Sequence, residues 1–512
     1  MSHSVKTVSP VRSEDMTASE IDPRLPKQFT GQRLVVLFFM IMIFAAAARP
    51  ISDPDFWWHL RTGQYITETK SIPYIDIFSW MRFGSEWVTH EWLSEVLMYL
   101  IYRAAGFAGL IIFFALVITM AFWTTYRLCL ERTGQPYIAG LVTILCAAAT
   151  IPTWGVRPQM FSILFAGIFL VVLDKYCRNQ KTRLVWWLIP LMVLWVNMHA
   201  GFAAGLALIG VTVVGLALDA RIRQKDSVSS IFLRIRRLCL VGVLAGTAVL
   251  LNPNGLRIYS YPFETLRSPV QMRYIQEWKS PNFQDPMFLA LLILIVLILC
   301  VLALSNKRPR PSEMLILIAT LAATLRSARN VPFFALVAAP TFADHLWSWF
   351  SAHRKGSQKS GGLAPVLGVL VFVVLPAIVA VMSVQRAVAR QPQVEAENFP
   401  VAAVEFIKSH EIPQPIYNEY HWGGYLIWKF YPQYRVFIDG RADVYGDALI
   451  EEYFTVHDGE PSWKTPIDKY KIRSVLVEPN TAIASLLRQD PSWQKVFEDQ
   501  QAVIFTNTLI IE

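Results

Sequence analysis

The sequence predicts an α-helical polytopic membrane protein that carries a C-terminal α/β domain outside the cytoplasm. Of the 512 residues, 54% are hydrophobic and only 17% are charged, whereas soluble globular chains average roughly 25% charged residues. A change to mixed polar and apolar patterning after residue 385 predicts the separate domain. The net charge of +9 does not indicate nucleic-acid binding, because the basic residues are dispersed between apolar segments rather than gathered on one soluble face.

About eleven apolar runs predict the membrane helices, since each crossing needs about 20 mostly apolar residues. The runs cover residues 34–48, 107–125, 138–153, 160–176, 184–198, 201–220, 238–251, 287–304, 312–325, 331–349 and 364–385. Several are short, so they must include flanking aromatic residues or cross where the bilayer is locally thin.

Basic clusters at alternate loops predict the orientation. They lie at residues 127–132, 175–183, 221–237, 307–310 and 354–359. By the positive-inside rule these loops and the N-terminus face the cytoplasm, and residues 34–48 remain as a signal anchor. The apolar run Trp92–Ala104 would invert every later loop if it crossed the membrane. We therefore expect an interfacial helix there, with Glu91 and Glu95 on its polar edge.

Three domains follow: a cytoplasmic tail at 1–33, a transmembrane domain at 34–385 with a first outer loop at 49–106, and an extracytoplasmic α/β domain at 386–512 after a linker at Arg390–Pro392. In the last domain strands are expected at Pro415–Tyr417, Arg435–Ile438, Ser474–Val477, Lys495–Phe497 and Ala502–Thr506, and helices at Val401–His410, Gly424–Phe430, Asp447–Phe454 and Ala482–Gln489. The domain lacks glycine-rich phosphate-binding motifs, so a nucleotide donor is not supported.

The five cysteines allow no disulfide framework and no CxxC metal site. All of them lie in predicted spans or at their cytoplasmic ends: Cys129, Cys146, Cys177, Cys239 and Cys300. Any metal must therefore be held by oxygen or imidazole ligands.

The most informative motif is Asp53-Pro54-Asp55, directly after the first span. Carboxylates at the mouth of a membrane helix cost free energy unless they are solvated, paired or used. One interpretation is a helix start, with Asp53 as N-cap and Asp55 favourable to the helix dipole. Another is chemistry: Asp55 and His59 are four residues apart and can pair on one helix face, and two aspartates can ligate Mg²⁺ or Mn²⁺.

Further polar residues are expected at the outer ends of the spans. His90 and Glu91 form a second cluster in the first outer loop, among tryptophans that either belong to the interfacial belt or stack on sugars. Between later spans lie Arg157, Asn197, His199, Arg326 and Arg329. The three arginines oppose the positive-inside trend, so they either reach lipid headgroups or bind a phosphate in bidentate fashion. In the C-terminal domain, the turn at Asp439-Gly440-Arg441 and Asp443 favours an ion pair over acceptor binding.

Seven segments resemble the C-type (GT-C) membrane glycosyltransferases, with a layout similar to protein O-mannosyltransferases and lipid A aminoarabinose transferases in a bacterial branch of that superfamily. They read DPDFWWHLRTGQYI, THEWLSEVLMYLIYRAAG, VRPQMFS, WVNMHAGF, LNPNGLRIY, RSARNVPFFA and GGYLIWKF…VFIDGRADVY. The resemblance covers nearly the whole chain after residue 33 and is specific for architecture rather than substrate.

The resemblance implies an inverting transfer from a polyprenyl-phosphate sugar to an acceptor lipid, glycan or protein, on the outer face of a bacterial inner membrane. A first-loop aspartate, Asp55 or Asp53, would be the general base; the chain has D-P-D where the mannosyltransferases have a D-E pair, which leaves open which aspartate acts. The expected substrate-binding residues are His59, His90, Glu91, Arg157, Asn197, His199, Arg326 and Arg329. Two alternatives remain: a transporter or flippase of a lipid-linked or anionic substrate, and a non-catalytic membrane scaffold.

Overall fold

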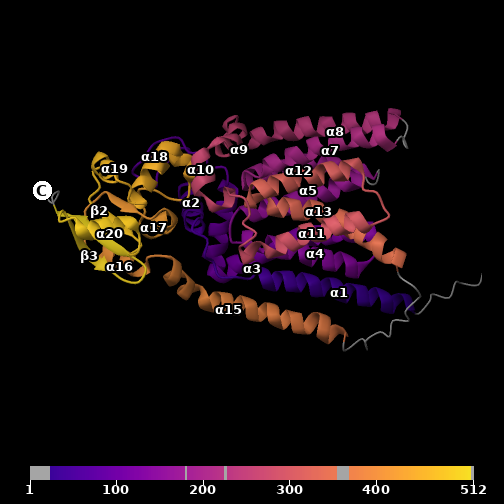
Figure 1. Ribbon diagram of the computed structural model, residues 1–512, viewed down its shortest axis with the longest axis horizontal. Coiled ribbons are helices and arrows are strands. Elements are labelled where there is room, and N and C mark those ends of the chain that lie inside the picture. Colours follow the sequence, from indigo (N-terminus) through magenta and orange to yellow (C-terminus); the bar gives the residue numbers. More distant parts are fainter. Residues whose placement is uncertain (1–23, 179–181, 224–227, 354–367, 509–512) are drawn as a thin grey trace, which may run out of the picture.

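The computed structural model describes residues 24–178, 182–223, 228–353 and 368–508 and is mostly helical (Figure 1). A helix lies over every predicted span: α1 (Arg24–Ala47), α3 (Trp92–Thr133), α4 (Pro136–Thr150), α5 (Gln159–Cys177), α6 (Leu188–Met198), α7 (Phe202–Arg223), α8 (Val228–Ala248), α11 (Leu289–Leu304), α12 (Pro311–Arg326), α13 (Val331–His353) and α15 (Leu375–Asn398). Most of the predicted cytoplasmic tail and the basic cluster at 354–359 lie outside the described residues.

Within the described ranges, six helical segments are long and apolar enough to cross a membrane, and two shorter ones, Gly31–Ala47 and Thr182–Met198, are also apolar. The helices thus form a multi-pass membrane bundle, while the number of eleven crossings stays a prediction. Short 3-10 or π segments flank the helices: η1 (Ile151–Thr153), η2 (Thr182–Trp187), η3 (Val249–Leu251), η4 (Gln276–Trp278), η5 (Pro286–Phe288), η6 (Ala328–Asn330), η7 (Leu370–Val374) and η8 (Tyr420–Trp422).

The two ends of the bundle differ in character. The C-terminal domain covers one end (Figure 1). Away from that end, ion pairs join helices that lie next to predicted basic clusters. Arg132 Nη2 lies 2.6 Å from Asp174 Oδ1, and Arg132 Nη1 lies 2.7 Å from Glu313 Oε1. These ion pairs are separate from the end that the domain covers, which agrees with basic clusters at every second loop of the sequence. The orientation of the bundle in the membrane stays a prediction.

The long helix α3 is broken at Gly106, whose φ of 58° and ψ of −153° are not helical. The segment before Gly106 is thus separate from the apolar segment after it, as the sequence predicts. It packs against α2 (Phe56–Thr69), where a β-carbon on Gly63 would lie 2.0 Å from the backbone oxygen of Glu95. The expected water-facing edge is wrong: Glu91 and Glu95 are 7% and 1% exposed. Both carboxyls contact His59 of α2, and Glu91 also contacts His90 and His199.

The C-terminal domain contains a four-stranded mixed sheet of order β1-β2-β4-β3. Strands β1 (Ile416–Asn418) and β2 (Ser474–Val477) are parallel, and β4 (Val503–Asn507) pairs antiparallel with β2 and with β3 (Trp493–Glu498). Its helices are α16 (Val401–Ser409), α17 (Gly423–Phe430), α18 (Ala442–His457), α19 (Lys464–Lys469) and α20 (Ala482–Gln489). The small α/β layer expected from the sequence is therefore present.

Two local predictions for this region are wrong. Arg435–Ile438 joins no strand of the sheet; instead Val436 pairs with the first outer loop, accepting from Trp80 N at 3.1 Å and donating to Phe78 O at 3.1 Å. No linker occurs at Arg390–Pro392, because α15 continues to Asn398. The amide of Gln391 holds this helix to the first outer loop through both backbone groups of Ile51, at 2.7 and 3.0 Å.

Candidate functional site

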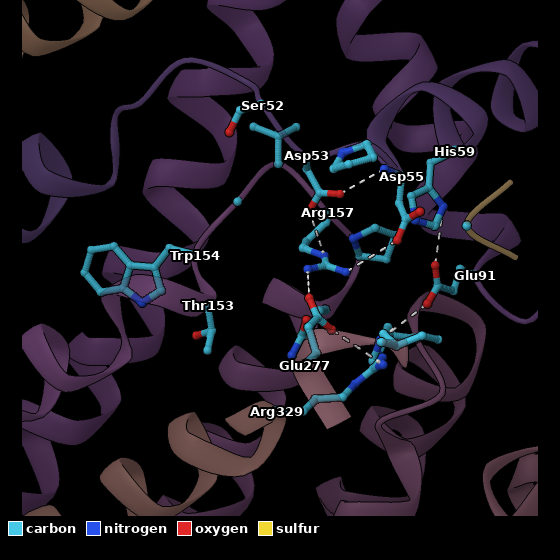
Figure 2. Close-up of a pocket in the computed structure, with 18 of the residues that line it drawn as sticks. Ser52, Asp53, Asp55, His59, Glu91, Thr153, Trp154, Arg157, Glu277 and Arg329 are labelled. Atoms are coloured by element: carbon cyan, nitrogen blue, oxygen red, sulfur yellow. Dashed lines mark hydrogen bonds and ion pairs between the residues drawn. The ribbon is translucent and has the colours of Figure 1, made fainter. Parts of the chain in front are cut away.

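A cavity of about 720 Å³ lies at the end of the bundle that the C-terminal domain covers. Its walls come from the first outer loop, from the turns between membrane helices, and from the C-terminal domain. Eight of the ten predicted site residues line it: Asp53, Asp55, His59, His90, Glu91, Arg157, His199 and Arg329. Polar groups that are spread over nearly 280 residues of sequence thus converge on one space (Figure 2).

Asn197 and Arg326 do not line the cavity. The side chain of Asn197 is buried, where it accepts from Trp92 Nε1 at 2.8 Å and donates to the Val193 carbonyl at 2.8 Å. Arg326 is exposed at the end of α12. Both residues therefore support or flank the site without facing it.

Arg157 is the central cation of the cavity (Figure 2). Its Nε lies 3.1 Å from Asp53 Oδ2, its Nη2 lies 3.7 Å from Asp55 Oδ2, and its Nη1 pairs with Glu277. Burial alone would lower the pKa of Arg157, but the three carboxylates outweigh it and raise that pKa. The sequence prediction of the site did not include Glu277, because nothing in the loop distinguishes it from the other acids there, Glu264 and Asp285.

The two aspartates are arranged by the turn before α2. The regular helix begins at Phe56, two residues after the predicted start, and Asp55 makes no side-chain cap bond. Asp53 nevertheless makes the predicted kind of capping contact with the turn that precedes the helix. In this contact Asp53 Oδ1 accepts from the backbone N of Asp55 at 2.9 Å. Asp55 Oδ1 accepts from Trp58 Nε1 at 3.1 Å. Both carboxylates are thereby fixed toward Arg157.

Asp55 has the chemistry of a base that titrates near neutrality. Burial, and then the nearby charge of Asp53, raise the pKa of Asp55 to about 7, against the opposing effect of Arg157. Burial also raises the pKa of Asp53. A metal between these aspartates would compete with the guanidinium of Arg157, so their arrangement does not favour the Mg²⁺ or Mn²⁺ ion considered from the sequence.

The imidazoles gather around Glu91. His59 does not pair with Asp55; its Nδ1 lies 3.1 Å from Glu95 Oε1 and 3.4 Å from Glu91 Oε2. His90 Nε2 lies 2.9 Å from Glu91 Oε1. Burial lowers the pKa of His59 to about 3, whereas for His90 the adjacent Glu91 outweighs burial and raises the pKa. Glu91 and His90 thus form the charged pair, and His59 stays neutral.

His199 is held in one tautomer. Its Nδ1 accepts from the backbone N of Gly201 at 2.9 Å and lies 2.7 Å from the hydroxyl of Ser162. That hydroxyl in turn accepts from Trp195 Nε1 at 2.8 Å, so it is free to donate to Nδ1. The proton of neutral His199 therefore sits on Nε2, which lies 3.3 Å from Glu91 Oε1.

Arg329 is loosely paired within the cavity. Its Nη1 lies 3.8 Å from Glu277 Oε2, and its guanidinium lies 5.0 Å from the ring centre of Trp278. Arg49, which the sequence did not single out as a site residue, also lines the cavity. The apolar part of the lining includes Phe114, Ile118, Ile151, Val156, Trp154 and Met287. The cavity thus offers cationic donors beside an apolar wall.

The C-terminal domain closes the cavity with Tyr420, Gly440 and Asp443. The turn before α18 contains the predicted ion pair, in which Arg441 Nη2 lies 2.7 Å from Asp439 Oδ2. Arg441 Nη1 also reaches Asp76 Oδ1 in the first outer loop at 2.7 Å. This buried link fixes the domain over the site, a role that the sequence could not reveal because Asp76 is far away along the chain.

Two solved structures resemble this arrangement. The archaeal oligosaccharyltransferase AglB from Archaeoglobus fulgidus, in complex with an inhibitory peptide and a dolichol-phosphate, matches with a TM-score of 0.51 and 13% identity over 88% of this chain and 70% of that chain. ArnT from Cupriavidus metallidurans in the apo state matches with a TM-score of 0.50 and 13% identity over 94% and 98%. The fold is GT-C-like. By sequence, no family model and no curated protein matches.

Proposed function

We propose that this protein is a membrane glycosyltransferase that moves a sugar from a polyprenyl-phosphate donor to an acceptor on the outer face of the membrane, with inversion at the anomeric carbon. The observation that carries the proposal is Asp55: a cavity-lining carboxyl whose pKa is raised to about 7, beside Arg157 and across the cavity from Arg329 (Figure 2). A base is most effective when its pKa lies near the working pH.

The donor phosphate would bind at the cations. Arg329, with its long contact to Glu277, retains N–H groups for a phosphate, and Arg157 adds positive charge behind the aspartates. Arginine binds phosphate oxygens in bidentate fashion. The apolar lining at Phe114 and Ile118 suits the first part of a polyprenyl chain. The AglB structure contains a dolichol-phosphate, which supports a lipid phosphate as ligand of this fold.

The acceptor would enter below the C-terminal domain. Tyr420 and Asp443 line the cavity from that side, near His90. These polar groups suit hydrogen bonds to the hydroxyls of a sugar or other acceptor. The acceptor's identity, as lipid, glycan or protein, is left to experiment.

The residues then perform one displacement. The acceptor hydroxyl loses its proton to the Asp55 carboxylate while its oxygen forms a bond to the anomeric carbon. The bond from that carbon to the phosphate oxygen breaks, and the lipid phosphate leaves with the electron pair. Arg329 and Arg157 stabilise the negative charge that develops on this leaving group. A water-excluding cavity strengthens that interaction.

The direct test incubates purified protein with a panel of polyprenyl-phosphate sugars and measures thermal stabilisation and sugar transfer, beside an Asp55→Asn variant. We expect one donor to stabilise both proteins and to be consumed only by the wild type. Stabilisation without transfer to any acceptor, together with transport of the lipid in proteoliposomes, would favour a flippase. Absence of any ligand response, with Asp55→Asn tolerated in cells, would favour a scaffold.

A further inference from the structure

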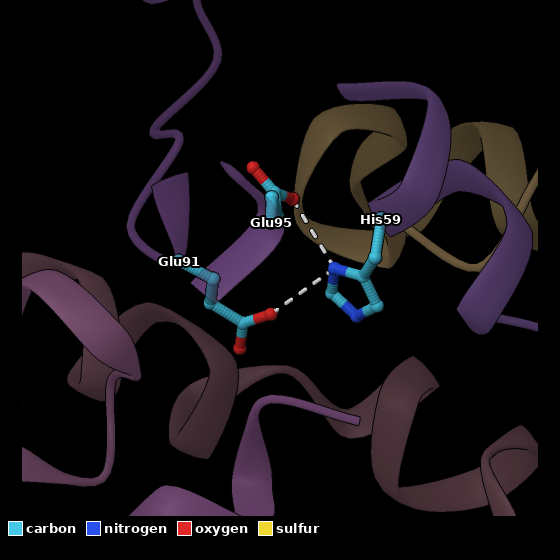
Figure 3. A group of neighbouring side chains, drawn as sticks. All are labelled: His59, Glu91 and Glu95. Carbon is cyan, nitrogen blue, oxygen red and sulfur yellow. Dashed lines mark hydrogen bonds and ion pairs between the residues drawn. The ribbon is translucent and has the colours of Figure 1, made fainter. Parts of the chain in front are cut away.

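A second cluster of ligand atoms lies beside the proposed reaction site. The cluster consists of three side chains that point toward one another (Figure 3). His59 lies on α2, Glu91 lies directly before α3, and Glu95 lies in the first turn of α3. One ligand atom of each lies within 4.8 Å of the other two. His59 and Glu91 line the cavity, whereas Glu95 does not. The cluster thus sits in the cavity wall.

The three side chains offer fewer hydrogen-bond donors than acceptors. His59 Nδ1 carries at most one hydrogen but faces Glu95 Oε1 at 3.1 Å and Glu91 Oε2 at 3.4 Å. The other oxygen of Glu95, Oε2, is buried and has no hydrogen-bond partner among the described residues. Leaving a buried carboxylate oxygen unpaired is costly. Burial and the charge of Glu91 raise the pKa of Glu95 well above its ordinary value, and the more distant Arg441 only partly opposes them. The ionised form of Glu95 therefore needs a closer positive charge than the described residues supply.

The spacing suits a metal ion. Zinc binds histidine nitrogen and carboxylate oxygen at about 2.0–2.2 Å, so two ligands at tetrahedral or octahedral angles lie roughly 3–3.5 Å apart. The two distances from His59 Nδ1 fall in that range. The Glu91 oxygen that does not face His59 is held in place, because this Oε1 lies 2.9 Å from His90 Nε2 and 3.3 Å from His199 Nε2. Such outer contacts orient metal-binding carboxylates.

We propose that His59, Glu91 and Glu95 bind one divalent cation of the Zn²⁺ or Mn²⁺ type. One imidazole and two carboxylates favour these ions over the purely oxygen-ligated Ca²⁺. The site differs from the Asp53 and Asp55 pair, whose carboxylates already face Arg157. The bound ion supplies the positive charge that lets Glu95 ionise, and it fixes the junction of α2 and α3 beside the cavity. Its binding can be measured whether or not the proposed transfer is correct.

The test measures metal bound per chain. Protein purified with a tag free of histidine is stripped with a chelator and titrated with Zn²⁺ or Mn²⁺, and bound metal is counted by elemental analysis. We expect one ion per wild-type chain, and an affinity at least about 10-fold weaker in Glu95→Gln and His59→Gln. Glu68→Gln is the matched control, because Glu68 is exposed on α2 and should bind metal like the wild type.

Three further results decide the site. Asp53→Asn should keep the ion; if that variant loses the ion while Glu95→Gln keeps it, the metal belongs to the aspartates and the proposal is wrong. Wild-type protein that binds neither ion stoichiometrically also overturns it. If Glu95→Gln does not fold, the conservative Glu95→Asp variant should recover metal binding, and metal should raise the melting temperature of the stripped wild type but not that of stripped His59→Gln.

Discussion

A β-carbon on Gly440 would lie 1.8 Å from Oδ1 of Asp55. The backbone of the C-terminal domain therefore contacts the candidate base directly, at a distance that only glycine permits. The neighbouring Gly424 approaches Pro54 in the same manner, with its β-carbon position 2.6 Å from the Pro54 carbonyl oxygen. The domain is thus part of the wall that positions Asp55, rather than a separate module tethered to the membrane.

Replacing Gly440 with alanine should displace Asp55. The added methyl group must move either the carboxylate or the loop, and a misplacement of about 1 Å in a catalytic group can cost about 10²-fold in rate. We expect Gly440→Ala to lower sugar transfer by that order while the protein still folds and binds donor. Gly246→Ala is the control, since Gly246 has open space around its β-carbon position. Equal activity of the two variants would show that Asp55 needs no such positioning.

Asp55 should give the reaction a pH dependence. Only its carboxylate form can accept a proton, and its pKa is raised to about 7. The value of kcat/KM should therefore fall as the pH drops below about 7 and level off above it. Asp55→Asn should lower the rate by about 10²–10⁴ and remove this limb of the profile. An unchanged acidic limb in a residually active variant would assign the titration to another group.

The same carboxyl should make the protein less stable at higher pH. The folded state keeps the Asp55 proton up to pH about 7, whereas the unfolded chain releases it near its ordinary pKa of about 3.9. Between these values the folded state binds more protons, so its stability decreases as the pH rises. Asp55→Asn lacks this loss. Its melting temperature, relative to the wild type, should rise between about pH 5 and pH 8; a constant difference would contradict the raised pKa.

Removal of Arg441 should weaken the attachment of the C-terminal domain to the first outer loop. Arg441 is 2% exposed and joins Asp439 to Asp76 of the first outer loop. Removing one partner of a buried ion pair typically costs about 3–5 kcal/mol. Arg441→Ala should therefore lower the melting temperature and make the junction sensitive to protease. Arg488→Ala is the control, because this exposed arginine contacts Pro479 and Glu498, both within the same domain, and it should leave the junction resistant to protease.

Local features of the chain were predictable because they depend on nearby residues. Apolar runs place a helix over each expected span, and Ser474–Val477 and Ala482–Gln489 form the expected strand and helix with the same bounds. Arg435–Ile438 has a strand-like pattern, but its backbone pairs with Phe78 and Trp80 rather than with the sheet. Choosing between those partners depends on tertiary contacts that a local pattern does not contain.

The site was predictable as a set of residues but not as a set of pairs. Alternation of the loops indicated that Asp53, His90, Arg157 and Arg329 share one side of the membrane. It did not indicate that Arg157 faces Asp53, or that Glu277 completes the cluster. Such pairing depends on how the helices pack around one another, and similar charges on neighbouring loops leave several pairings equally plausible from sequence.

Arg326 and Arg329 are close in sequence but differ in their relation to the cavity. Arg329 lines the cavity, whereas Arg326, three residues earlier, is exposed and does not. If Arg329 holds the donor phosphate, Arg329→Ala should weaken binding of a polyprenyl phosphate by about 10-fold or more, since a hydrogen bond to a charged group contributes about 1.5–3 kcal/mol. Arg326→Ala should change that affinity little. Binding can be followed by thermal shift or by displacement of a fluorescent lipid phosphate, without any need for turnover. Equal losses in both variants would point to general attraction of anionic lipid. No loss in either variant would move the phosphate to Arg157 or Arg49, which also line the cavity.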